Sequence, residues 1–261
     1  VQAVQKLFRE YTGYIRARLE GTDGEMAQIA CNYPADQDEI HAESMEEQKA
    51  NWFSGARIQP VVQGMELALE LDRNTWYDLY QRNPIERFAE QYWKENGIDG
   101  WEEYKTIPDR LYIGNAFCHL LFPKEEQLFA LMEKAIVENM EITLVFPCMR
   151  EFQVEEQGKL LKKVDNWCEK RQTRVEILVN DWGMTALVKE SGKHLEPCLG
   201  VLLNKQKKDP RMRYKKGSTR GLGESNLQAD FYRTFLKDTY GITRYEWESC
   251  GYPQVFPQGK N

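Results

Sequence analysis

Several signatures of familiar site types are missing from this sequence of 261 residues. It has only three histidines and six widely spaced cysteines, with no C-x-x-C and no H-x-x-x-H pair, so zinc-finger and thioredoxin-type spacings are excluded. No G-x-G-x-x-G or G-x-x-x-x-G-K motif follows a strand-like run. This absence argues against a Rossmann or P-loop nucleotide site.

Long apolar runs are also missing. No stretch approaches the roughly 18 to 20 apolar residues that a membrane span requires, and residues 1–21 lack the apolar core of a signal peptide. We therefore expect a cytoplasmic protein with no membrane contact. The net charge of −6 and a pI near 5.4 argue against general binding of nucleic acid, although a local basic patch remains compatible with them.

What is present divides the chain in two. Residues 1–107 are predicted to be mainly helical: apolar side chains recur at 3–4 spacing in residues 1–19, and two helices are expected in "RNTWYDLYQRN" and "NPIERFAEQYWKENG". The pattern of apolar and polar residues changes in residues 108–261. There, continuous apolar runs typical of buried parallel strands alternate with amphipathic helical segments.

The expected strands are "RLYIGNAFC", "EITLVFPC", "RVEILVND", "HLEPCLGVLLN" and "ITRYEWESC". The segments between them, such as "VEEQGKLLKKVDNWCEKR", have a helical period. This order predicts an α/β fold of parallel βα units. Five units are compatible with a TIM-barrel-like or partial barrel, or with an open doubly wound sheet.

In parallel α/β folds, functional side chains gather at the carboxyl edge of the sheet, where the loops leaving the strands converge. Four cysteines fall at or just inside predicted strand ends. Four thiolates are what a 4Fe–4S cluster requires, and a zinc ion would also accept them. The alternative is four separate buried thiols, as free cysteines commonly are. The predicted ligands are Cys118, Cys148, Cys198 and Cys250.

Polar residues share these strand ends. Asp181 is a candidate for orienting a substrate or acting as a base, and its alternative role is to cap the following helix. His119 is the second catalytic candidate, although a surface or core role is the alternative. Asn180 and Asn204 are candidates for substrate binding because each ends a predicted strand.

A basic segment, residues 205–220, carries eight Lys or Arg against one Asp and follows the fourth predicted strand. Lys207, Lys208 and Arg211 could attract an anionic small molecule or an RNA backbone. The alternative is a solvated loop.

The C-terminal part resembles the peptidase U32-like family. The run "VEILVNDWGMTALVKESGKHLEPCLGVLLNKQ" has a strand ending in N-D-x-G, a short helix and a strand ending in L-N, and "FYRTFLKDTYGITRYEWES" is similar to a later unit of that family. The resemblance covers roughly residues 110–255. It implies a TIM-barrel-like fold, an iron–sulfur centre and oxygen-independent hydroxylation, with Asp181 at the edge of the site. The cysteine-rich G-A-x-C segment of the family is absent, so its cluster ligands cannot be carried over.

Three hypotheses follow. The first is an iron–sulfur oxidoreductase or hydroxylase, or a subunit of one, completed by the N-terminal helices, a protein partner or a homo-oligomer. The second is a non-catalytic partner protein that docks through its helical N-terminal region. The third is a hydrolase with a cysteine nucleophile and His119 as its base.

Overall fold

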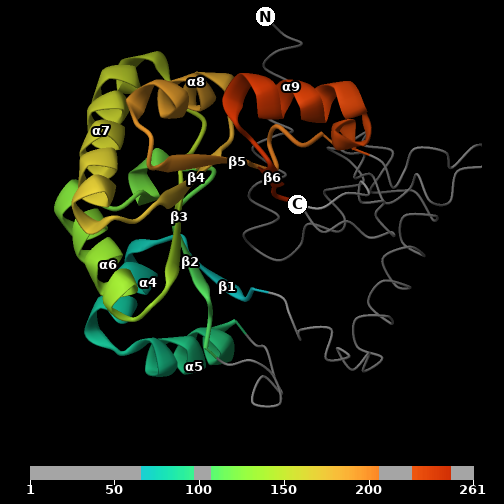
Figure 1. The fold of residues 1–261 in the computed structure, drawn as a ribbon. Coiled ribbons are helices and arrows are strands. Elements are labelled where there is room, and N and C mark those ends of the chain that lie inside the picture. Colours follow the sequence, from blue (N-terminus) through green and yellow to red (C-terminus); the bar gives the residue numbers. More distant parts are fainter. Residues whose placement is uncertain (1–65, 97–106, 206–224, 248–261) are drawn as a thin grey trace, which may run out of the picture. The chain divides into compact units, whose positions relative to one another are not determined.

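The computed structural model describes residues 66–96, 107–205 and 225–247, all of which belong to one compact unit (Figure 1). In this part of the chain, six strands form one all-parallel sheet in the order β1-β2-β3-β4-β5-β6. The strands are β1 (Ala68–Leu71), β2 (Arg110–Gly114), β3 (Glu141–Val145), β4 (Val175–Val179), β5 (Leu195–Leu199) and β6 (Arg244–Tyr245). The structure thus confirms the predicted α/β fold of parallel βα units.

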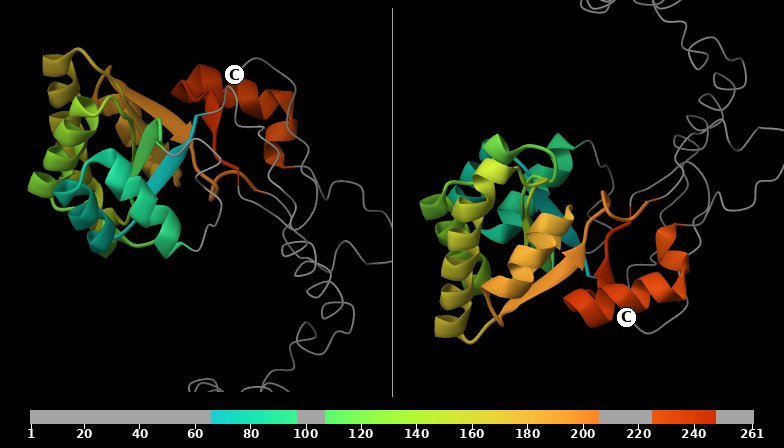
Figure 2. Two further views of the ribbon diagram at one scale, coloured as in Figure 1. Left: turned by 90° about the horizontal axis from the view of Figure 1, so that it is seen from below. Right: turned by 90° about the horizontal axis from the view of Figure 1, so that it is seen from above.

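A helix occupies every connection between neighbouring strands. The helices are α4 (Asn74–Arg82), α5 (Ile85–Glu95), α6 (Glu125–Val137), α7 (Val154–Arg171), α8 (Trp182–Ser191) and α9 (Asp230–Tyr240). Parallel strands require such crossovers, because a two-residue hairpin can join only antiparallel strands. Helices α4, α6, α7 and α8 lie side by side along one face of the sheet (Figures 1 and 2).

The core lies between this face and the helices. From the strands, Leu71, Ile113 and Leu144 are fully buried, and they belong to the same apolar cluster as Phe88 and Met132 of the helices. Burying a side chain of this size contributes about 1.5–3 kcal/mol, so this layer accounts for most of the stability of the unit.

The sheet is curled into a half-barrel, and one ion pair makes the curl measurable. In a flat six-stranded sheet, five spacings of about 4.8 Å would separate the two edge strands by about 24 Å. Instead, Nη2 of Arg244 on β6 lies 3.7 Å from Oε2 of Glu66, which directly precedes β1. Two side chains can meet in this way only if the edges of the sheet approach each other.

The end of β2 requires a glycine. Gly114 has a φ of +128°, and a Cβ placed there would lie 2.2 Å from the carbonyl oxygen of Val145 on β3. Any side chain would therefore separate β2 from β3 at the carboxyl edge.

The structure adds a strand that the sequence analysis did not predict. Residues 66–96 contain the two expected helices, α4 and α5, but also β1, which pairs with β2. The sheet therefore begins before the predicted boundary at residues 107 and 108. The helix expected in residues 1–19 lies outside the described residues.

Within the described part of the chain, the helices are too short or too polar for any of them to cross a bilayer.

Candidate functional site

The inner face of the half-barrel is polar where the outer face is apolar. Side chains alternate along a strand, so residues between the core positions point away from the helices. On this inner face lie Glu70, Arg110, Tyr112, Thr143, Val145, Glu176, Leu178, Glu196, Cys198 and Arg244.

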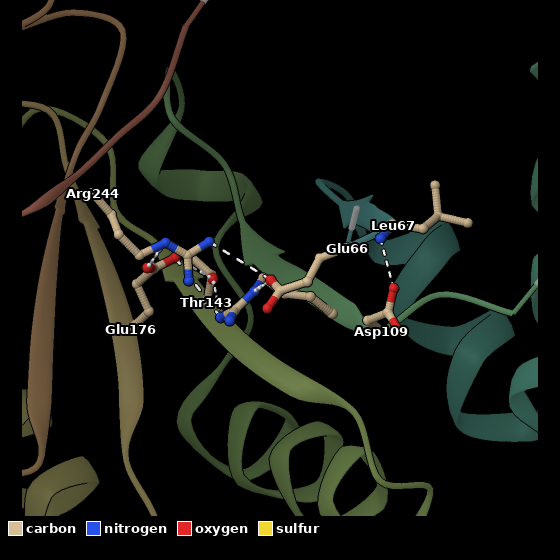
Figure 3. A network of polar contacts seen from close by, with 7 residues as sticks. Glu66, Leu67, Asp109, Thr143, Glu176 and Arg244 are labelled. Atoms are coloured by element: carbon tan, nitrogen blue, oxygen red, sulfur yellow. Dashed lines mark hydrogen bonds and ion pairs between the residues drawn. The ribbon is translucent and has the colours of Figure 1, made fainter. Parts of the chain in front are cut away.

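A charged network closes the amino ends of the strands (Figure 3). Arg110 and Glu176 are each only 6% exposed. The hydroxyl of Thr143 donates to Glu176 Oε1 at 2.7 Å and accepts from Arg110 Nη1 at 3.1 Å. Arg244 Nε lies 3.2 Å from Glu176 Oε2, and Arg110 Nε lies 3.2 Å from Glu66 Oε2.

An open pocket of about 440 Å³ adjoins this network, and Arg174 and Glu196 line it as an ion pair of 2.8 Å. The arginines that line the pocket all have carboxylate partners, and the amino face of a barrel usually serves stability. We therefore assign the network to the fold.

A small apolar layer lies above the network. Tyr112, Val145, Leu178, Cys198 and Ala116 form it, separate from the main core. The Cys198 thiol is 3% exposed, and burial, followed by the charge of Glu176, raises its pKa far above the usual value for cysteine. The Cys198 side chain therefore packs as a small apolar residue in this layer.

We call the carboxyl-end rim of the inner face the mouth, and its described residues are Glu70, Asn180, Gly200, Asn204 and Glu246. Asn180 directly follows β4, is 2% exposed, and joins three strand ends. Its Nδ2 donates to the carbonyl of Phe146 at 3.2 Å, and its Oδ1 accepts from the Leu202 N–H at 3.4 Å. The Asn180 side chain therefore fixes the loops that surround the mouth.

Asp181 caps α8, as the alternative role predicted. Its Oδ1 accepts from the Met184 N–H at 2.8 Å, and its Oδ2 accepts from the Met149 N–H at 2.7 Å. Both carboxylate oxygens thus accept hydrogen bonds from backbone N–H groups, one at the start of α8 and one in the loop after β3. Its catalytic role stays a prediction.

Cys148 is the exposed thiol next to this loop. Its Sγ lies 3.6 Å from the backbone carbonyl of Asn180. Partial desolvation, followed by the charge of Asp181, raises the pKa of Cys148, while Lys205 acts in the opposite direction. The thiol is therefore accessible but mostly protonated at neutral pH.

Cys118 and His119 lie in a different loop. Asn115 Oδ1 accepts from the Phe117 and Cys118 N–H groups at 2.9 and 2.8 Å, which shapes the turn after β2. The ring of His119 packs edge-to-face with Phe152, with 6.3 Å between centroids, and His119 lines an open pocket between the starts of α6 and α7. Among the described residues, no hydrogen bond joins His119 to Asp181.

Glu70 and Glu246 are the mouth residues that the sequence analysis missed. Glu246 Oε2 accepts from the Val201 N–H at 3.0 Å, and desolvation raises the pKa of Glu246. Desolvation, then Asp72 and Glu246, raise the pKa of Glu70. Because Glu70 lies on β1 and Glu246 directly follows β6, the charge of Glu246 can act on Glu70 only because the sheet curls.

Asn204 completes the mouth after the turn that follows β5. It is 5% exposed, and its Nδ2 donates to the backbone carbonyl of Glu246 at 2.9 Å. Its Oδ1 is buried, yet it accepts no hydrogen bond within the described ranges. An unpaired buried acceptor is uncommon in a folded protein and calls for an explanation.

The structure thus brings some of the predicted site residues together and separates others. Asn180, Asp181, Cys148 and Asn204 converge on the mouth and its loops, whereas Cys198 lies in the apolar layer. No three His, Cys, Asp or Glu side chains of the described residues form a group that could hold a metal. The predicted residues that lie outside the described ranges are Cys250, Lys207, Lys208 and Arg211.

Comparison with models of protein families, with curated proteins and with solved structures found no match to this chain. The resemblance to the U32-like family therefore stays a prediction.

Proposed function

We propose that this chain is an enzyme, or the substrate-binding subunit of one, and that its substrate binds at the mouth of the half-barrel. The observation that carries this proposal is the unpaired, buried Oδ1 of Asn204, whose amide also holds the backbone of Glu246. A buried acceptor without a donor is costly for stability alone, and Asn204 lies where parallel α/β folds place their sites, at the same sheet end as the half-buried Glu246 and the exposed Glu70.

The carboxyl groups supply the chemistry in this proposal. A carboxyl group with a raised pKa keeps its proton closer to neutral pH, so Glu246 is suited to donate a proton to a substrate and to take it back. Asn180 and Asp181 hold the surrounding loops, so we assign them positioning roles. Cys148 lies close enough to these loops to contact a substrate that protrudes from the mouth.

For the reaction class, we propose the oxygen-independent redox or hydroxylation chemistry that the U32-like resemblance implies, in the cytoplasm. Free thiols at the four described cysteines suit a reducing compartment. Among the described residues, no three His, Cys, Asp or Glu side chains are grouped to hold a metal, and Cys198 packs in the apolar layer. A cluster or a zinc ion would therefore need ligands from outside the described residues.

Two measurements test the proposal. The chain is purified under nitrogen, passed through a small-molecule extract and desalted, and the retained compounds are identified by mass spectrometry. We expect a compound that Glu246→Gln loses and Glu196→Gln keeps. Glu196 is the matched control, because it lies on the same face at the other end of the sheet and the substitution changes the net charge equally. Equal retention by both variants would contradict the mouth as the site.

Iron, acid-labile sulfide and zinc per chain test the redox part separately. Iron and sulfide in near-equal amounts, retained in Cys198→Ser, support a cluster with other ligands. A preparation without any of these elements would remove the redox and zinc assignments and leave the mouth proposal standing.

A second candidate function is that of a protein partner, and exposed apolar side chains favour it. Phe117 and Leu120, in the loop after β2, are 77% and 76% exposed, and Phe152, after β3, is 71% exposed. Apolar side chains gathered in two neighbouring loops are typical of interaction surfaces. Light scattering of the purified chain and of Phe117→Ser and Phe152→Ser variants tests this, because a homo-oligomer should dissociate in both variants.

A further inference from the structure

Helix α9, which lies beside α8 (Figure 1), carries aromatic side chains on both its inner and its outer face. On the inner face, Leu236 is fully buried, and the ring centroid of Tyr240 lies 5.7 Å from that of Trp182 on α8. On the outer face, Phe231 is 77% exposed and Phe235 is 43% exposed. These two residues are four positions apart, so their side chains share one stripe of the helix surface.

Trp182 continues this stripe onto the start of α8. It is 41% exposed, and its ring centroid lies 6.2 Å from that of Phe235. We call Phe231, Phe235 and Trp182 the α9 patch. Aromatic side chains gathered in one exposed patch are typical of a protein interface.

Two exposed charges of opposite sign flank the α9 patch. Asp230 begins α9 with its side chain 89% exposed, and Lys237 is exposed near the end of the helix. They are seven residues apart, close to two helical turns, so they lie on the same flank of α9. Asp230 contacts Arg233 of its own helix, but its exposed carboxylate leaves room for a second cation. Among the described residues, Lys237 forms no ion pair.

From these observations, we propose that α9 is a dimer contact, on which a second copy of this chain packs its own α9 in the antiparallel direction about a two-fold axis. With the axis at the level of Arg233, Phe231 lies against the second copy's Phe235, and Asp230 lies beside the second copy's Lys237. A two-fold interface makes each of these contacts twice. In a parallel pair, like charges would meet instead. The charge pattern of α9 therefore matches a second copy in the antiparallel orientation.

The size of the contact predicts a weak dimer. A helix of 11 residues is about 16 Å long, so two such helices bury less than the roughly 1,200 Å² that stable interfaces reach. We therefore expect monomer and dimer to exchange at micromolar concentrations. Sedimentation equilibrium of the full chain from about 1 µM to about 1 mM covers the Kd range of such contacts.

Two phenylalanines of equal exposure test the location of the contact. Phe231→Ser should raise the Kd of the dimer at least about tenfold, because both copies lose the ring. Phe117→Ser is the matched control, because Phe117 is also 77% exposed but lies in the loop after β2, so this variant should dimerise as the wild type does. Thermal unfolding confirms that each variant is folded. Dissociation of Phe117→Ser alone would overturn the inference and place the contact at the loops of the second candidate function.

Charge reversal tests the antiparallel register. Lys237→Glu places a carboxylate beside the second copy's Asp230 and should raise the Kd about three- to tenfold. Adding Asp230→Lys to the same chain restores opposite charges across the axis, so the double variant should return to within about twofold of the wild type. Lys162→Glu, at an exposed position of α7, changes the net charge as Lys237→Glu does and should leave the Kd unchanged.

Four further outcomes would overturn the inference. They are a monomer at all these concentrations, a dimer that Phe231→Ser leaves intact, a double variant that dimerises no better than Lys237→Glu, and equal weakening by Lys162→Glu. None of these variants changes a mouth residue, so their results are separate from the test of the proposed function.

Discussion

Replacing Glu176 with alanine should destabilise the protein strongly, because Glu176 is the hub of the network that closes the half-barrel. Its carboxylate accepts from Thr143 at 2.7 Å and contacts Arg244 at 3.2 Å and Arg110 at 3.8 Å. Arg110 is almost fully buried, so without Glu176 its charge depends on the half-exposed Glu66 alone.

The magnitude follows from this geometry. Removing one member of a buried ion pair costs about 3–5 kcal/mol, because the remaining charge loses its partner in a low-dielectric site. Since Arg110 keeps Glu66, we expect the lower end, about 3 kcal/mol. In a domain of this size that corresponds to a decrease in Tm of about 6–12 °C.

Glu196→Ala is the matched control. Glu196 is the register partner of Glu176 on β5, but its ion pair with Arg174 is exposed, and such pairs contribute about 0–1 kcal/mol. Urea unfolding followed by circular dichroism gives both free energies by linear extrapolation. Equal losses in the two variants would refute the claim that the buried network closes the sheet.

Three further predictions concern glycine positions, thiol reactivity and pH. Gly200→Ala should destabilise by about 1–3 kcal/mol in urea unfolding, because a Cβ would lie 2.1 Å from an amide oxygen at the mouth. Gly158→Ala, within α7 and in ordinary contact distance of its neighbour at 3.4 Å, should stabilise by about 0.5–1 kcal/mol, and the same sign for both variants would contradict this account. Cys148 should be alkylated by iodoacetamide in the native protein, and Asp181→Asn should speed this reaction by lowering the thiol pKa; a slower or unchanged rate, followed by mass spectrometry, would show that the Asp181 charge has no influence. The pKa of Glu246 is raised above its usual 4.5, so the folded state binds more protons than the unfolded state. The contribution of Glu246 to stability should therefore fall as the pH rises from the usual pKa to the raised pKa of this group. The Tm of Glu246→Gln relative to that of the wild type should therefore increase as the pH rises through this range, and parallel plots of Tm against pH would contradict the assignment.

Much of the fold could be predicted because local and tertiary preferences agree. Helix α7 spans Val154–Arg171, the same residues as the segment predicted from its helical period. Strand β4 is an apolar run that is buried along its whole length, as parallel strands are. Strand β1 was missed because its four residues, Ala68–Leu71, alternate in burial and form a strand only by pairing with β2.

The site was harder to predict because it depends on the curl of the sheet. The strand-end positions of Asn180, Asp181 and Cys148 indicated that these residues are close in space, and they are, because neighbouring parallel strands end together. Glu70 and Glu246 lie on opposite edges of the sheet, and no local pattern indicates that such edges meet. The sequence signal available for the inner face was a polar residue inside an otherwise apolar strand, such as Glu176 in "VEILV".

The most direct test of the mouth as the binding site is hydrogen exchange with and without the compound that the wild-type chain retains from extract. The account predicts slower exchange in residues 199–205 and 244–247, which carry Asn204 and Glu246 and form the rim of the mouth. Unchanged exchange there, with protection instead in residues 172–176 at the opposite end of the sheet, would contradict it.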